Sequence, residues 1–201
     1  MYIKLYEENP NPKEVLKVVD ILKNGGIIIY PTDTVYAFGC DIFQPKAIEK
    51  ICRLKHIEPK KSMLSIVCQD LSDISQYAKV SNSIFKLLKR NLPGAFTFIL
   101  NGSSSLPSSL KNRKTIGIRV PKNYIALEIV RALGNPIFTT SIITADDLTE
   151  YETDPELLRE RYESMVDLVI NGGYGDHTPS TIIDCTEEPP TIIRQGKGDV
   201  L

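Results

Sequence analysis

The sequence of 201 residues lacks the segments that would place it in a membrane or direct its export. No window holds the roughly 18 consecutive apolar residues that a membrane span needs. Residues 1–10 contain no apolar core of signal-peptide length, so we expect no export by that route. A cytoplasmic protein without a membrane partner is therefore the default prediction.

Cysteine and histidine are too few and too scattered for a zinc site or a disulfide framework. The chain has only two histidines, and no C-x-x-C pair occurs among its four cysteines. Because a chain of this length can bury a core without cross-links, we expect reduced, mostly buried thiols and no protein-bound metal site. The residues concerned are His56, His177, Cys40, Cys52, Cys68 and Cys185.

Three common motifs of nucleotide-binding and hydrolytic enzymes are also absent. The sequence has no G-x-x-x-x-G-K-[ST] loop and no G-x-G-x-x-G after a predicted strand, so neither usual phosphate-binding loop is present. It has no G-x-S-x-G motif, and two distant histidines do not favour a hydrolytic triad. Any catalytic or nucleotide-binding site must therefore be built from residues outside these three motifs.

What is present is typical of a globular α/β domain. The chain is 42% hydrophobic and 24% charged, and no repeat or linker divides it, so we predict a single domain over 1–201. Helical and strand patterns alternate without strict βαβ order, which favours a twisted, mixed sheet with flanking helices. Helices are expected at about 12–24, 45–55, 71–77, 81–91, 124–133 and 154–162, and strands at 27–30, 62–67, 95–100, 115–120, 136–141, 166–170, 181–185 and 191–194.

The net charge of −1 conceals a separation of charge along the chain. Residues 46–61 hold six Lys or Arg against two acids, and residues 111–122 hold five and no acid. Between 146 and 167 the sign reverses, with nine acids against two arginines. The basic stretches could meet around a polyanion such as a nucleotide or RNA, or they could be solvated surfaces.

The segment 30–40 places polar groups at the end of a buried strand. Thr32, Asp33 and Thr34 follow the apolar run 27–30, and small residues that suggest a turn come next. Open α/β sheets bind ligands at strand ends, where these hydroxyls and a carboxylate could orient an amine or a metal. The alternative is a local turn in which the same side chains cap the backbone.

Five segments together resemble the YrdC/YciO family, which includes the threonylcarbamoyl-AMP synthases. They are IIIYPTDTVYAFGCD (27–41), KTIGIRVP (114–121), PIFTTS (136–141), TPSTIIDCT (178–186) and IIRQGKGD (192–199). The resemblance covers about 10–200 and implies a YrdC/RibB-like domain with a concave, positively charged cavity. It also implies a reaction in which L-threonine, bicarbonate and ATP, with Mg²⁺, give threonylcarbamoyl-AMP and pyrophosphate for tRNA modification.

The resemblance carries roles onto matching residues of this sequence. It implies catalytic roles for Lys55 and Ser141. The implied threonine contacts are Thr32, Arg119 and Ser180, and the implied nucleotide contacts are Lys55, Thr115, Ser141 and Arg194. An arginine fork suits a carboxylate or phosphate, and catalysis would consist of positioning and charge neutralisation.

Two positions depart from the synthase pattern. Ile57 stands where K-x-R has arginine, and Ile143 stands where S-x-N has asparagine, which resembles the YciO branch. Isoleucine can neither neutralise phosphate nor donate a hydrogen bond, so weak or altered activity is expected. The alternatives are a small-molecule binder and a protein that binds double-stranded RNA or tRNA, with candidate phosphate contacts at Lys50, Arg53, Lys60, Lys61, Arg113 and Lys114.

Overall fold

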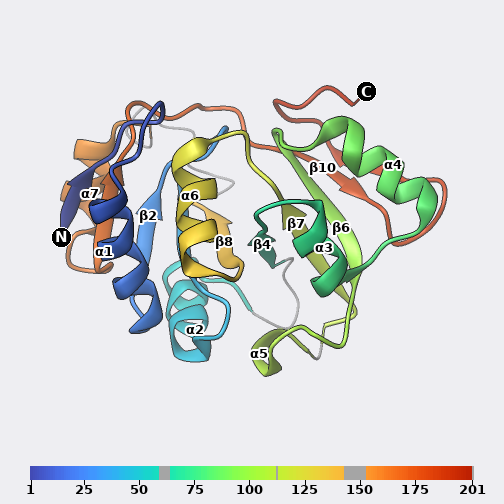
Figure 1. The fold of residues 1–201 in the computed structure, drawn as a ribbon, viewed down its shortest axis with the longest axis horizontal. Helices are drawn as coiled ribbons and strands as arrows, with labels where there is room; N and C mark the ends of the chain where they lie inside the picture. Colours follow the sequence, from blue (N-terminus) through green and yellow to red (C-terminus); the bar gives the residue numbers. More distant parts are fainter. Residues whose placement is uncertain (59–63, 112, 143–152, 201) are drawn as a thin grey trace.

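The structure is a computed structural model that describes residues 1–58, 64–111, 113–142 and 153–200 (Figure 1). The helices are α1 (Pro12–Lys23), α2 (Pro45–Leu54), α3 (Leu71–Tyr77), α4 (Asn82–Asn91), α5 (Ser108–Lys111), α6 (Tyr124–Leu133) and α7 (Pro155–Tyr162). The strands are β1 (Tyr2–Lys4), β2 (Ile28–Tyr30), β3 (Ala37–Asp41), β4 (Ser65–Val67), β5 (Ala78–Lys79), β6 (Phe96–Gly102), β7 (Thr115–Arg119), β8 (Ile137–Ser141), β9 (Leu168–Asn171), β10 (Thr181–Asp184) and β11 (Thr191–Arg194). None of the described helices is long and apolar enough to cross a membrane.

Most helices begin where local capping chemistry predicts. The Asn11 side chain accepts a hydrogen bond from the Lys13 amide at 3.0 Å, and Pro12 occupies the first turn of α1. Asn123 accepts from the Ala126 amide at the start of α6. These bonds satisfy amides that have no partner inside the helix, so the sequence fixes the helix starts locally.

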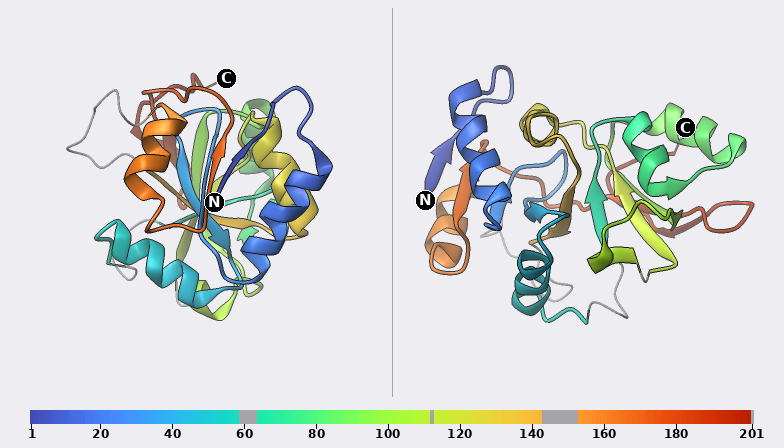
Figure 2. Two further views of the ribbon diagram at one scale, coloured as in Figure 1. Left: turned by 90° about the vertical axis from the view of Figure 1, so that its left-hand side faces the viewer. Right: turned by 60° about the horizontal axis from the view of Figure 1, so that its bottom comes forward.

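All the strands belong to one mixed sheet, which confirms the predicted α/β class. The strand order is β1-β9-β2-β3-β8-β4-β7-β6-β10-β11, and β5 pairs with β6. β9 is parallel to both β1 and β2, β4 to β7 and β6 to β10, whereas β3 and β8 are antiparallel to their neighbours. The views in Figure 2 show how strongly this sheet twists.

The predicted turn after Thr34 is wrong, because Ala37–Asp41 forms the central strand β3. All five residues are buried, and the strand pairs with both β2 and β8. The small residues are needed for close packing and do not form a turn. A Cβ on Gly39 would lie 2.8 Å from the Tyr30 ring. Pairing with β8, about 100 residues further on, is a tertiary effect that local patterns do not carry.

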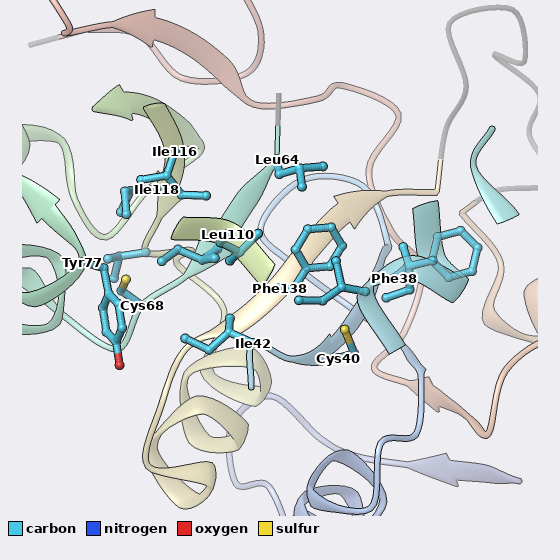
Figure 3. Packing of buried hydrophobic residues seen from close by; sticks show 14 of the residues in the cluster. Phe38, Cys40, Ile42, Leu64, Cys68, Tyr77, Leu110, Ile116, Ile118 and Phe138 are labelled. Atoms are coloured by element: carbon cyan, nitrogen blue, oxygen red, sulfur yellow. The ribbon is translucent and has the colours of Figure 1, made fainter. Parts of the chain in front are cut away.

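Each face of the sheet has its own apolar core. Phe38, Phe138, Ile118 and Leu64 belong to the larger cluster, part of which is drawn in Figure 3. The opposite face packs against α1 and α6, which contact each other. Where this second face continues over β4, β7 and β6, Ser65, Gly117 and Thr97 are small or polar and leave room for a cavity.

Candidate functional site

Two arginines line a cavity of about 140 Å³ over the middle of the sheet. We call it the arginine cavity. Among the described residues that line it, none carries a carboxylate, and most contribute hydroxyl groups. The lining consists of Thr34, Val35, Ser65, Thr97, Arg119, Thr139, Thr140, Ser141, Pro179, Ser180, Ile182 and Arg194. This composition suits an anion with several hydrogen-bond acceptors.

The strand register creates the floor of this cavity. Ser65 of β4 lies opposite both Thr139 of β8 and Gly117 of β7, so the three residues share one face. A Cβ on Gly117 would lie only 2.3 Å from the Ser65 Oγ atom. The hydroxyl of Tyr30 bonds to the Thr139 Oγ1 atom at 2.8 Å and supports this floor from the side.

Arg119, at the end of β7, is the buried cation of the site. Its side chain is 7% exposed, and its Nη2 atom donates to the Asp33 Oδ1 atom at 2.9 Å and the Thr34 Oγ1 atom at 3.0 Å. Its Nε atom is buried and has no hydrogen-bond partner in the described structure. Because buried polar groups are normally satisfied, this atom indicates a missing acceptor, such as a ligand oxygen.

Arg194 of β11 brings a second positive charge to the same cavity. Its Nε and Nη2 atoms donate to the Ser180 carbonyl at 3.2 and 2.8 Å. Burial, and then the positive charge of Arg119, lowers the pKa of Arg194. A partly buried arginine whose charge is disfavoured by a neighbouring arginine is expected to attract an anion.

Four of the predicted site residues therefore meet in one cavity: Arg119, Ser141, Ser180 and Arg194. They come from β7, β8, β11 and the segment just before β10, which are widely separated in sequence. Residues predicted to contact threonine and residues predicted to contact the nucleotide lie in the same small cavity, so its lining does not divide into two subsites. These roles stay predictions, as does a positive charge over the wider concave surface.

Thr32 lines an adjoining cavity of about 540 Å³, which we call the tyrosine groove. The groove shares Thr34 with the arginine cavity. Its lining is Glu7, Thr32, Asp33, Thr34, Gly94, Ala95, Lys122, Asn123, Tyr174, Gly175, Asp176, His177 and Lys197. The Thr32 hydroxyl donates to the Val35 carbonyl and accepts from the Thr34 amide, so the capping turn also forms.

The Asp33 carboxylate forms an ion pair with Arg119 and does not belong to a metal site of the described residues. Its second oxygen, Oδ2, accepts from the Lys122 amide at 2.9 Å. In the described ranges, no group of three His, Cys, Asp or Glu side chains could hold a metal ion. Since the described lining of the arginine cavity has no carboxylate, those lining residues do not build a protein site for Mg²⁺.

Lys55 and Thr115 line neither cavity. The Lys55 ammonium group donates to the Ile142 carbonyl at 2.7 Å, which holds the end of α2 beside the end of β8. Thr115 lies at the opposite end of β7 from Arg119. Ile57 packs against the larger core cluster, so it brings no polar group to the site. Ile143, Lys60 and Lys61 lie outside the described residues.

The two basic stretches approach each other beside α2. Lys50 and Arg53 are exposed on α2, and Lys114 is exposed before β7. Burial raises the pKa of the Cys52 thiol, and the nearby charge of Arg113 opposes that shift. Arg113 therefore lies close to α2, in agreement with the neighbouring positions of α2 and α5 in Figures 1 and 2.

Sequence reasoning missed the strand hydroxyls and most of the tyrosine groove. Thr97 and Thr139 are polar residues at buried strand positions, which was the available signal for the arginine cavity. Lys122, Tyr174 and His177 reach the groove from loops that only the tertiary structure brings together. All four cysteines are buried and free, as expected.

Comparison with known proteins assigns the family. The family model named Sua5_yciO_yrdC, described as "Telomere recombination", matches residues 20–196. This chain belongs to the Sua5/YciO/YrdC family. Escherichia coli YciO is 42% identical over 202 residues, which cover 99% of this chain and 97% of YciO. The crystal structure of E. coli YciO matches with a TM-score of 0.92 at 41% identity over 99% of this chain and 97% of that chain.

More distant members of the Sua5/YciO/YrdC family carry synthase names. A putative threonylcarbamoyl-AMP synthase of Methanocaldococcus jannaschii is 34% identical over 202 residues, covering 96% of this chain and 92% of that protein. A solved crystal structure shows P. abyssi Sua5 in complex with L-threonine. It matches with a TM-score of 0.87 at 24% identity over 98% of this chain and 57% of that chain, which shows the shared fold.

Proposed function

We propose that this family member binds L-threonine and ATP and forms threonylcarbamoyl-AMP, at a rate lowered by Ile57 and Ile143. In this reaction the threonine amine and bicarbonate form a carbamate with loss of water. A carbamate oxygen then displaces pyrophosphate from the α-phosphorus of ATP. Every reactant is anionic or carries a carboxylate, so the site must stabilise negative charge.

The observation that carries the proposal is the pair Arg119 and Arg194 in a cavity whose described lining residues include no carboxylate. The buried Nε atom of Arg119 supplies a donor that a carboxylate or phosphate oxygen can satisfy. The volume of about 140 Å³ is below the about 300–1,000 Å³ typical of small-molecule sites, which suits an amino acid better than a whole nucleotide. We therefore assign threonine and the reacting carbamate to this cavity, with most of the ATP outside it.

A Mg²⁺ ion in this proposal travels with ATP. Magnesium usually keeps phosphate oxygens and water as ligands and needs few protein groups. The two arginines provide the charge in the cavity itself, and Ser141 and Ser180 provide hydrogen bonds. The described residues leave bicarbonate without an assigned contact.

The test is pyrophosphate release that requires ATP, threonine and bicarbonate together. Arg119→Lys keeps the charge but loses the planar fork, so we expect a loss of about 10²–10³-fold in rate. Arg90→Lys makes the same exchange at an exposed position of α4 and should leave the rate unchanged. Absence of threonine-dependent pyrophosphate and of threonine binding in the parent protein would refute the proposal.

A second candidate function is RNA binding by the basic surface beside α2. It is favoured by the approach of Arg113 to Cys52, which brings the two basic stretches together. Replacing Lys50 and Arg53 by Ala should weaken binding of double-stranded RNA and flatten its salt dependence by about two units of slope. RNA affinity that does not change with salt would contradict this candidate.

A further inference from the structure

The tyrosine groove lies beside the arginine cavity, and the proposed reaction assigns no reactant to it. Its volume of about 540 Å³ falls within the about 300–1,000 Å³ typical of small-molecule sites. Of the predicted site residues that the structure describes, only Thr32 lines it. The groove and the arginine cavity meet at Thr34, so two ligands could lie next to each other.

Most charges in the groove already have partners. Asp33 binds Arg119 and the Lys122 amide. Asp176 binds the Lys197 ammonium group at 2.7 Å, and Lys197 also donates to the Asp33 carbonyl at 2.8 Å. Since these carboxylates are neutralised, they do not make the groove a cation site.

Three groups of the groove remain available to a ligand. Over the described part of the chain, the Lys122 ammonium group and the His177 imidazole have no hydrogen bond or ion pair. The side chain of Tyr174 is 81% exposed, which leaves its ring open for stacking. An exposed aromatic ring beside a lysine and a histidine is the combination that receives a base and its phosphate.

Hydrogen bonds to neighbouring segments fix the position of the loop that carries Tyr174. The Tyr36 hydroxyl donates to the Gly173 carbonyl at 2.7 Å and accepts from the Gly172 amide at 3.1 Å. The Asp176 amide donates to the Thr34 carbonyl at 3.1 Å. These bonds tie the loop to the buried segment that follows β2, so little order has to be gained on binding.

We propose that the tyrosine groove is a nucleotide-binding site separate from the arginine cavity, with the base stacked on Tyr174 and the phosphate held by Lys122 and His177. The nucleotide is either free or part of a single RNA strand, since both present the same base and phosphate. This site binds whether or not the chemistry proposed for the arginine cavity occurs.

The experiment measures binding of AMP and of a short single-stranded oligoadenylate by titration calorimetry. Tyr174→Ala should weaken binding about 5- to 150-fold, whereas Tyr174→Phe keeps the ring and should bind nearly as well as the parent. Phe85→Ala removes an exposed aromatic ring from α4, outside the groove, and should have no effect. Lys122→Gln should weaken binding and reduce the salt slope for the oligonucleotide by about one.

The outcomes separate the sources of the nucleotide and the two proposals. Binding of AMP alone assigns a free nucleotide, binding of the oligoadenylate alone assigns an RNA strand, and both results support the site. Failure of both probes to bind, or binding that Arg119→Lys abolishes and Tyr174→Ala leaves unchanged, would overturn it. Absence of pyrophosphate release refutes only the synthase proposal, because these titrations need no turnover.

Discussion

Replacement of Asp33 by Asn tests whether the buried ion pair with Arg119 organises the site. Both side chains are less than a tenth exposed, with the Arg119 Nη2 atom 2.9 Å from the Asp33 Oδ1 atom. The amide of Asn can still accept from the Lys122 amide, so the change removes charge with little change in shape. Arg119 would then remain buried without its counterion.

The expected loss of stability is large. Removing one partner of a buried ion pair is destabilising by about 3–5 kcal/mol. For a chain of this length, each kcal/mol lowers Tm by about 2–4 °C, so Asp33→Asn should melt about 6–20 °C below the parent. The measurement is urea and thermal unfolding followed by circular dichroism.

Glu14→Gln provides the matched control. Glu14, which is partly exposed, pairs with the exposed Lys17 of α1 at 2.8 Å, and surface pairs of this kind contribute about 0–1 kcal/mol. If Asp33→Asn loses no more stability than Glu14→Gln, the burial argument fails. A ligand anion should also replace the missing charge, so added pyrophosphate should raise the Tm of Asp33→Asn more than that of the parent. Equal stabilisation of both proteins would show that Asp33 does not compete with the anion.

Three further predictions concern activity, packing and pH. Ile57→Arg restores the K-x-R pattern and should raise threonine-dependent pyrophosphate release by at least tenfold, because a cation returns near the phosphates. An unchanged rate in a folded variant would show that position 57 does not limit the reaction. Gly117→Ala should lower the free energy of unfolding by about 1–3 kcal/mol in urea titrations, because its Cβ would meet the Ser65 Oγ atom, and adding Ser65→Gly should restore part of the loss. Burial raises the pKa of Cys185 from 9.0 to about 12, so the thiol loses its proton at lower pH in the unfolded chain than in the folded one. The free energy of unfolding should therefore fall as pH rises from about 9 to about 12. Cys185→Ala should flatten this alkaline decline, and an identical pH profile in the variant would contradict the assignment.

The helices and most strands could be predicted because their signals are local. Caps at Asn11 and Asn123 and the apolar run of β2 act within a few residues, and the structure has these elements close to their predicted bounds. The strand β3 could not be predicted, since Gly39 reads locally as a turn residue. Its extended form depends on the Tyr30 ring above it and on pairing with two strands.

For the site, the sequence by itself determined which residue types were present, including the hydroxyls and carboxylate of 32–34 and the arginines at 119 and 194. Only the tertiary structure decided that Asp33 pairs with Arg119, that Arg194 lies beside the same cavity, and that Lys55 bonds to Ile142 instead. The physical reason is distance along the chain: Asp33 and Arg119 are 86 residues apart, and their contact depends on the order of the strands between them. Local propensities extend over a few residues. The electrostatic interaction between two charged groups becomes strong enough to position side chains only after folding has removed the surrounding water.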